Sequence, residues 1–317
     1  MPLGIRPTND MAFKKTFGTP ENKLCLISLL NAILVLKSPI IDVTIENPYN
    51  LQDFESDKLS ILDVKAVDQS GAIHDVEMQL TVFSGLVQRI VFYGCELYAG
   101  QLKAGENYDQ LRPAYSICLI DGILWRDATA VHHRFQLVDQ PSGRVLHDTL
   151  EIHTLELGRY TLTEGDLPTA STLEWWLFWL LHAHEYEPDD LLRLFPQAAF
   201  QQATRTITQI AHRTEDKAMY DAREKAIRDY QSAINSAHQE GRQEGQQIGE
   251  QIGEKRGEQR GEQRGQQQGA LMGKIVTLQE ILGLTPTDNG TLNAMSIAEL
   301  EEMASKLQQS VRSRSSS

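Results

Sequence analysis

The sequence predicts a mixed α/β fold in which helices pack on the faces of a sheet, followed by a helical region and a tail with glycine at every fourth position. Two strands, at 59–67 and 73–80, alternate apolar and polar residues and are joined by a glycine-containing turn. A segment with helical spacing follows at 84–105, and then a continuous apolar strand at 114–121. This order of helix, strands, helix and strands differs from the regular alternation of a doubly wound parallel sheet.

Two helices are predicted before the hairpin, at 8–18 and 20–36. The second opens at Pro20, which suits the first turn of a helix because an N–H has no helical partner there. Its apolar residues recur at helical spacing and are Leu24, Ile27, Leu30 and Ile33. We expect both helices to cover one face of the sheet.

The turn of the hairpin is predicted at 68–72, where Gly71 supplies the backbone freedom of a tight loop. Such a turn pairs its flanking strands antiparallel. The helix after the hairpin is expected to end at Gly105 as its C-terminal cap. Two further strands are predicted at 132–140 and 149–157, separated by the turn PSGR.

The C-terminal half is predicted to be mainly helical. Its apolar run LEWWLFWLL is about half as long as a membrane span, which favours a buried helix. Two short helices are expected at 273–284 and 296–311, the second capped by Ser296 with Glu299, before a disordered end. The predicted parts are a sheet-containing domain at 1–165, a helical region at 166–239, the glycine repeat at 240–273 and a helical hairpin with a disordered end at 274–317.

Glycine recurs at every fourth residue from Gly241 to Gly273, with Gln, Glu and Arg filling most of the gaps. Four helical residues turn by about 400°, so a glycine stripe would drift around the helix and favour a right-handed wrap with close backbone approach. Each glycine costs a helix about 1 kcal/mol relative to alanine. We expect a marginal helix that orders when it forms a homo-oligomer, and the alternative is a flexible polar linker.

Composition limits the classes of function. Of the 317 residues, 41% are apolar, which is enough for a buried core in at least one domain. A formal charge of −13 argues against a protein that coats nucleic acid nonspecifically, because neutralising phosphates needs a basic surface. A local basic groove stays open, although we interpret the basic residues of the N-terminal third as ordinary solvated surface; they are Arg6, Lys14, Lys15, Lys58, Lys65 and Arg89.

Targeting and cofactor signals are few. Three widely spaced cysteines without a CxxC pair fit a reducing compartment. The chain opens without a signal-peptide pattern and has no apolar run near eighteen residues, so we expect a cytoplasmic protein with no membrane partner. No glycine-rich phosphate loop follows a predicted strand, so no nucleotide cofactor is expected.

The residues most informative about chemistry lie on the hairpin. Because strand side chains alternate between faces, Asp75, Glu77 and Gln79 project together, and Asp63 and Lys65 share one face of the preceding strand. The two sets can therefore meet. Carboxylate and amide oxygens suit a hard divalent cation, Mg²⁺ or alternatively Mn²⁺ or Ca²⁺. The other interpretation is the ordinary polar outer face of an antiparallel hairpin.

The order of helix, strand with Asp63, hairpin, strand with Glu77 and Gln79, long helix and apolar strand resembles the PD-(D/E)XK nuclease superfamily. Within it, the chain resembles the Rpn family of recombination-promoting nucleases and transposases. The further segments that carry this resemblance cover most of residues 8–273; they are NDMAFKKTFG, RIVFYGCELYAGQLKAGENYDQLRPAYSICLID, LEIHTLELGRY and YDAREKAIRDYQSAINSAHQEGRQEG. The resemblance implies a restriction-endonuclease-like fold and a metal-dependent DNA endonuclease linked to recombination, transposition or defence against foreign DNA.

The resemblance also implies roles for single residues. The superfamily's metal-binding aspartate falls on Asp63, its second acidic ligand on Glu77 and its catalytic lysine position on Gln79. An acidic residue on the first helix of the superfamily best matches Asp10, as a further metal ligand. The glutamine departs from the superfamily's lysine, because an amide can orient a water molecule but supplies no positive charge. Lys65 could supply that charge, or be a plain surface lysine.

The resulting hypothesis is that Asp63 and Glu77 hold a divalent ion, which lowers the pKa of a water molecule and binds the scissile phosphate while Gln79 orients that water. Two other classes of function stay open. One is a catalytically inactive relative that binds DNA or protein through the same fold. The other is an interaction protein whose helical and glycine-repeat tail carries the function.

Overall fold

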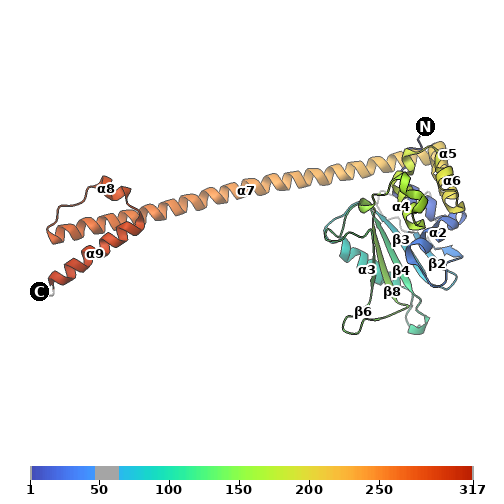
Figure 1. Cartoon of the computed structure of the whole chain (residues 1–317), viewed down its shortest axis with the longest axis horizontal. Coiled ribbons are helices and arrows are strands. Elements are labelled where there is room, and N and C mark those ends of the chain that lie inside the picture. Colours follow the sequence, from blue (N-terminus) through green and yellow to red (C-terminus); the bar gives the residue numbers. More distant parts are fainter. Residues whose placement is uncertain (1, 47–63, 316–317) are drawn as a thin grey trace. The chain divides into compact units, whose positions relative to one another are not determined.

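A computed structural model describes residues 2–46 and 64–315 of the chain. By its internal contacts the chain divides into two compact units, Met1–Arg228 and Asp229–Ser317. The first unit contains a six-stranded sheet with helices on both faces (Figure 1). The predicted mixed α/β fold is therefore confirmed. None of the helices in the described part of the chain combines the length and the apolar character that crossing a bilayer requires.

The six-stranded sheet mixes antiparallel and parallel pairs. Its strands, in spatial order, are β1 (Val43–Ile45), β2 (Val64–Asp68), β3 (Ile73–Gln79), β4 (Ala114–Ile120), β8 (Leu150–Glu156) and β5 (His132–Gln136). The hairpin β2–β3 is antiparallel as predicted, and β3, β4 and β8 run parallel. Strands β1 and β5 add antiparallel edges on the two sides. A separate small hairpin joins β6 (Val138–Asp139) to β7 (Arg144–Val145).

Helices cover both faces of the sheet. The elements of the first unit are α1 (Asp10–Phe17), η1 (Pro20–Asn22), α2 (Lys23–Leu34), α3 (Leu86–Ala99), η3 (Tyr108–Gln110), η4 (Leu157–Arg159), η5 (Glu164–Thr169), α4 (Thr172–His182), η6 (Ala183–Glu185), α5 (Pro188–Leu194) and α6 (Ala198–His212). On one face, Val76 of β3 and Ile117 of β4 belong to the main core, which α1, α2, α4 and α6 complete. On the other face, α3 packs Leu86 and Ile90 against Cys118 in a smaller cluster. The apolar run of α4 is buried as predicted, with Trp176 and Trp179 inaccessible to solvent.

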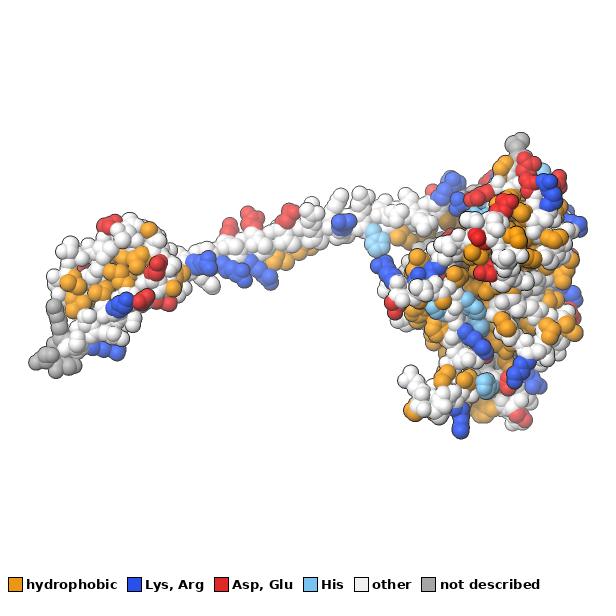
Figure 2. All heavy atoms as spheres, viewed as in Figure 1, with side chains coloured by type: hydrophobic (Ala, Val, Ile, Leu, Met, Phe, Trp, Pro, Cys, Tyr) orange, Lys and Arg blue, Asp and Glu red, His pale blue; other side chains and the backbone are white. Residues whose placement is uncertain are grey.

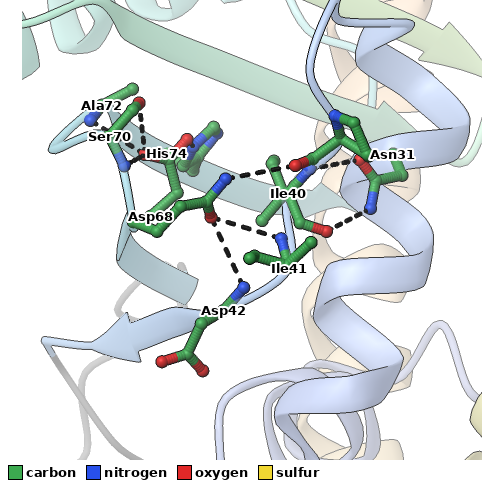
Figure 3. A network of polar contacts seen from close by, with 10 residues as sticks. Asn31, Ile40, Ile41, Asp42, Asp68, Ser70, Ala72 and His74 are labelled. Carbon is green, nitrogen blue, oxygen red and sulfur yellow. Dashed lines mark hydrogen bonds and ion pairs between the residues drawn. The ribbon is translucent and has the colours of Figure 1, made fainter.

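Asp68 organises the turn between β2 and β3 (Figure 3). Its Oδ1 accepts hydrogen bonds from Ser70 N at 2.7 Å, Ser70 Oγ at 2.6 Å and Ala72 N at 3.1 Å, and its Oδ2 lies 2.9 Å from His74 Nε2. Burial alone would raise the pKa of Asp68, but the hydrogen bonds from His74 and Ser70 outweigh it and lower the pKa to about 2. Gly71 has a φ of 85°, which explains the glycine at this position.

This turn predicts a specific pH dependence of stability. A carboxyl whose pKa is lowered by folding stabilises the protein above its unfolded-state pKa of about 3.9, and that contribution is lost as the pH falls toward about 2. Asp68→Asn should lower the free energy of unfolding by about 1.5–3 kcal/mol near neutral pH, and the difference from the wild type should shrink in acid. Urea unfolding across this pH range measures it, with the exposed Asp109→Asn as control. A difference that does not change with pH would contradict the assignment.

Several predicted boundaries differ from the structure. Helix α3 ends at Ala99, because Gly100 N donates to Glu96 O and the Gln101 side chain bonds the backbone of Arg112, so Gly105 is not its cap. The predicted strand at 132–140 is interrupted after Gln136, where the chain enters the small β6–β7 hairpin.

The second unit is entirely helical in its described part. Helix α7 (Thr214–Leu282) begins in the first unit and contains the whole glycine repeat, so the structure shows the repeat as helix. It is followed by α8 (Asn289–Ala294), where a turn was predicted, and by α9 (Ile297–Ser315). The predicted Ser296–Glu299 cap is confirmed by reciprocal hydrogen bonds. The expected disordered end is wrong up to Ser315, the last described residue, because α9 continues through it.

Candidate active site

The register of three strands sets the candidate site on the α3 face of the sheet. Lys65 of β2 pairs with Asp75 of β3, and residues directly opposite each other in an antiparallel pair point to the same face. Asp75, Glu77 and Gln79 alternate along β3 and therefore share that face with Lys65. In the parallel direction, Glu77 is opposite Cys118 of β4. The register places Lys65 opposite Asp75, with Glu77 two residues further along β3 on the same face; the predicted meeting of Glu77 with Asp63 lies outside the described residues.

Glu77 is buried, with 9% of its surface exposed. Arg89 lies on the first turn of α3, and its Nη2 atom is 3.4 Å from Oε1 of Glu77. The guanidinium of Arg89 also lies over two aromatic rings, 5.3 Å from the centroid of Tyr93 and 5.9 Å from that of Phe83. This arrangement holds a positive charge directly beside a buried carboxylate.

Arg89 keeps one further donor. Its Nε atom is buried and has no hydrogen-bond partner among the described residues. A buried N–H of this kind needs an acceptor, and phosphate oxygens are good acceptors for arginine. From the sequence, Arg89 was interpreted as ordinary solvated surface, whereas its side chain is 27% exposed and is paired with Glu77. The signal that could have placed it is its spacing of four residues from Tyr93, on the side of α3 that carries Leu86 and Ile90.

Gln79 and Asp75 complete the described part of the site. The amide nitrogen of Gln79 donates to Thr81 O at 2.9 Å, which fixes the orientation of this side chain and leaves its carbonyl oxygen as an acceptor. Asp75 is 7% exposed and lies between Lys65 and Ser116 in the sheet register. Two carboxylates and an amide oxygen therefore line one face of β3.

Asp63, the predicted first metal ligand, lies outside the described residues. The first described residue of β2 is Val64, which pairs with Val76. Among the residues that the structure describes, no three His, Cys, Asp or Glu side chains form a group able to hold a metal ion.

Asp10, the predicted further metal ligand, forms an ion pair. Its Oδ2 lies 2.5 Å from Arg223 Nε on α7, and its Oδ1 accepts a hydrogen bond from Met11 N at 2.8 Å. Burial raises the pKa of Asp10, and the Arg223 guanidinium opposes that rise. Two more contacts join α7 to the N-terminal segment, from Asn9 to Glu224 and from Arg6 N to Tyr220. For Asp10 to bind a metal ion, its pair with Arg223 would have to open.

The cysteines differ in their surroundings. Cys118, beside Glu77 in the sheet, is buried, and burial together with the Glu77 charge raises the pKa of its thiol well above the usual range. Burial also raises the pKa of Cys25, to about 12. Cys95 on α3 is exposed. The two buried thiols stay protonated at neutral pH, so the negative charge of the site resides on its carboxylates.

A second polar feature of the first unit is a cavity of about 440 Å³ between the α1–η1 segment and α6. It is lined only by polar and charged residues: Lys15, Thr19, Glu21, Asn22, Gln202, Arg205, Thr206, Gln209 and Arg213. Lys15 is paired with Asp216 at 2.5 Å, whereas Arg205 and Arg213 form no ion pair with a described residue. The cavity therefore presents cationic and amide donors.

The sheet order, with an antiparallel hairpin leading into parallel strands and acidic residues on its central strand, defines a restriction-endonuclease-like fold. The family of PD-(D/E)XK nuclease family transposases matches residues 7–237, which span the whole sheet and the helices packed on it. The chain belongs to this family, and the resemblance seen in the sequence is confirmed. Membership supports a nuclease-type function.

Two further comparisons gave no match. Neither a search of curated proteins nor a search of solved structures found a significant similarity to this chain.

Proposed function

We propose that this protein is a divalent-metal-dependent DNA endonuclease that hydrolyses phosphodiester bonds. The observation that carries the proposal is the buried Glu77 carboxylate beside Arg89, on the strand where the resemblance seen in the sequence implies the second acidic ligand. Family membership makes nucleic acid the expected substrate, and DNA is the form to which the term transposase applies.

The donor chemistry fits a hard divalent cation. Asp63 and Glu77 would hold it, and Asp75 is a further carboxylate on the same face. Oxygen donors of this type suit Mg²⁺, with Mn²⁺ or Ca²⁺ as alternatives. When bound, such an ion stabilises negative charge on phosphate oxygens and makes a water molecule more acidic. Asp10 would join this set only on losing its pair with Arg223.

The protein's own side chains then have separate tasks. The carbonyl oxygen of Gln79, fixed by the hydrogen bond from its amide to Thr81, would accept a hydrogen bond from the attacking water and orient it. The exposed part of the Arg89 guanidinium would bind a phosphate oxygen, and Lys65, on the same face, would add positive charge that Gln79 lacks. Charge stabilisation is thereby divided between two residues instead of one catalytic lysine.

The cavity between α1 and α6 lies on the side of the sheet opposite Glu77, so Arg205 and Arg213 would contact phosphate groups only away from the candidate active site. The family name supports a role in transposition. The resemblance to recombination-promoting nucleases adds recombination and defence against foreign DNA as proposed roles.

One observation favours a second candidate, a catalytically inactive DNA-binding or protein-binding module. Glu77 is engaged by Arg89, and Gln79 stands where the superfamily has lysine. An arginine competes with a metal ion for the same carboxylate, so a chain that never releases this pair would bind DNA without cutting it.

Metal dependence tests the proposal. Supercoiled plasmid DNA incubated with the full-length protein and Mg²⁺ should be nicked, and addition of EDTA should abolish nicking because the carboxylates alone cannot activate water. Restoring excess Mg²⁺ or Mn²⁺ should restore the rate, while Ca²⁺ should support DNA binding. Agarose gels measure the rate, and electrophoretic mobility shift measures binding. DNA binding that needs no metal, with no nicking under any metal, would favour the inactive module.

A further inference from the structure

Aromatic side chains that are open to solvent gather around α3. Phe83 lies in the turn before the helix, which the hydrogen bond from Leu86 N to Phe83 O closes, and Phe92 and Tyr93 lie on the helix itself. The exposed fractions are 41% for Phe83, 63% for Phe92 and 39% for Tyr93, and we call these three rings the aromatic platform. Figure 2 shows hydrophobic side chains reaching the surface of the first unit among charged ones.

The packing of α3 does not require the rings of Phe92 and Tyr93. The helix places Leu86, Ile90 and Gly94 against the sheet, at every fourth residue. Phe92 is about 200° from Ile90 around the helix, so its ring points away from the sheet, and Tyr93 is about 60° from Ile90, at the edge of the buried stripe. Neither ring belongs to a hydrophobic cluster of the described residues. Their exposed surface is therefore available to a ligand.

Arg89 links the aromatic platform to the candidate active site. The carbon of its guanidinium lies 5.9 Å from the ring centroid of Phe83 and 5.3 Å from that of Tyr93. Its Nη2 atom lies 3.4 Å from Oε1 of Glu77. Tyr93 in turn meets Phe92 edge to face, with ring centroids 5.6 Å apart. A phosphate held at the exposed part of Arg89 would therefore have aromatic rings beside it.

This combination of rings and a cation fits a nucleic-acid strand with unpaired bases. A single strand alternates planar bases with anionic phosphates, and proteins that bind it combine aromatic rings with cationic groups. The core of a protein–protein interface is instead depleted of charged residues, whereas here the partly exposed Arg89 lies among the rings. In a duplex the bases stack on each other, so their faces are hidden from a protein. The platform therefore favours a strand whose bases are free.

We propose that the aromatic platform stacks with unpaired bases, so that this protein prefers single-stranded DNA to duplex DNA. The inference rests on the proposed function, because it places the backbone of the strand at Arg89, beside Glu77. Phe92 and Tyr93 hold bases next to the phosphate that the exposed part of Arg89 contacts. A duplex would have to open at this point before its bases could reach the rings.

Binding to three labelled probes tests this preference in the full-length protein, with Ca²⁺ present and gels confirming that the probes stay intact. The probes are oligothymidine of about 20 nucleotides, an abasic strand of the same length and a blunt duplex of the same length. Fluorescence anisotropy should show that wild type binds oligothymidine at least about tenfold more tightly than the abasic strand, which carries the same phosphate charge. It should also bind oligothymidine more tightly than the duplex, although electrostatic attraction alone would favour the more highly charged duplex.

Removing the rings should remove the preference. The double variant Phe92→Leu, Tyr93→Leu keeps apolar side chains but has no ring face, so its affinities for oligothymidine and for the abasic strand should agree within about threefold. Its affinity for the abasic strand should stay within about threefold of the wild-type value, because Arg89 is retained. The double variant Phe92→Tyr, Tyr93→Phe conserves both rings and should keep the wild-type preference.

The matched control is Val91→Ala, at a side chain of the same helix that is 45% exposed and about 100° away from Phe92. It should bind all three probes as wild type does. Wild type that binds the abasic strand or the duplex as tightly as oligothymidine would overturn the inference. A leucine variant that keeps the preference would also overturn it, because apolar surface without rings would then suffice. Equal losses for both single strands would mean that the rings only hold Arg89 in place, which is again contrary to stacking.

The result is distinguishable from the outcome for the proposed function, because the probes report binding without cleavage. Base-dependent binding with no nicking under any metal would support the aromatic platform and contradict the endonuclease. Nicking by a protein that shows no preference for bases would support the endonuclease and contradict the platform.

Discussion

Glu77→Gln should lower the rate of plasmid nicking about a hundredfold or more while leaving the fold intact. Glutamine keeps the size of the side chain and a carbonyl oxygen that can accept from Arg89, but it loses the negative charge that would hold a divalent ion. Asp63→Asn should produce a comparable loss for the same reason. The expected effect is large because removal of either carboxylate weakens both ion binding and water activation.

The control for this experiment is Glu96→Gln, the same substitution at an exposed position of the neighbouring helix α3. It should nick DNA at the wild-type rate. Circular dichroism and the urea midpoint confirm that each variant is folded. If Glu77→Gln nicks as fast as the control, nicking does not depend on this carboxylate, and the inactive-module alternative or a contaminating nuclease becomes the better explanation.

Trp176→Ala should lower the free energy of unfolding of the first unit by about 3–5 kcal/mol. The Trp176 side chain is fully buried on α4 and stacks on Phe200 of α6 with ring centroids 4.0 Å apart. It also meets Phe17 and Trp179 edge to face, and its Nε1 donates to Ser28 Oγ at 3.1 Å. Alanine would leave a large cavity where α1, α2, α4 and α6 converge.

Urea unfolding followed by tryptophan fluorescence measures this loss. All four tryptophans, Trp125, Trp175, Trp176 and Trp179, lie in the first unit, so the signal reports on that unit even after one is removed. Tyr108→Ala, at a side chain that is 84% exposed, should change the free energy of unfolding by less than about 0.5 kcal/mol. A loss below about 1 kcal/mol for Trp176→Ala would mean that this core rearranges to fill the space.

The hairpin was predictable because its signals are local. Period-two alternation and a glycine turn determine both the pairing of β2 with β3 and the face on which Lys65, Asp75 and Glu77 lie. The capping box of α9 is similarly local, since Ser296 and Glu299 are three residues apart. Patterns of this kind need no knowledge of the rest of the chain.

Other features depend on distant partners and were not predictable. Asp10 pairs with Arg223, more than two hundred residues away, and nothing in the spacing near Asp10 indicates that contact. The position of Arg89 over Glu77 depends on how α3 packs against the sheet. The end of α3 is a similar case. Gly100 and Gly105 are both suitable as a C-terminal cap from the sequence, and the hydrogen bonds between the Gln101 side chain and the Arg112 backbone favour the end at Gly100.

The glycine repeat shows that helix propensity alone does not predict the structure of a segment. Its composition disfavours helix, yet the structure continues α7 through every glycine. Helix propensity describes a segment taken alone and is a weak guide here, because α7 is helical on both sides of the repeat.

The unequal surroundings of the three thiols make this protein suitable for selective labelling. Cys25 and Cys118 are sheltered and protonated, so a maleimide reagent should react at Cys95 alone. Cys95 lies on the same helix as Arg89, six residues further along. A fluorophore attached there would label the helix that supplies Arg89 without any engineered cysteine.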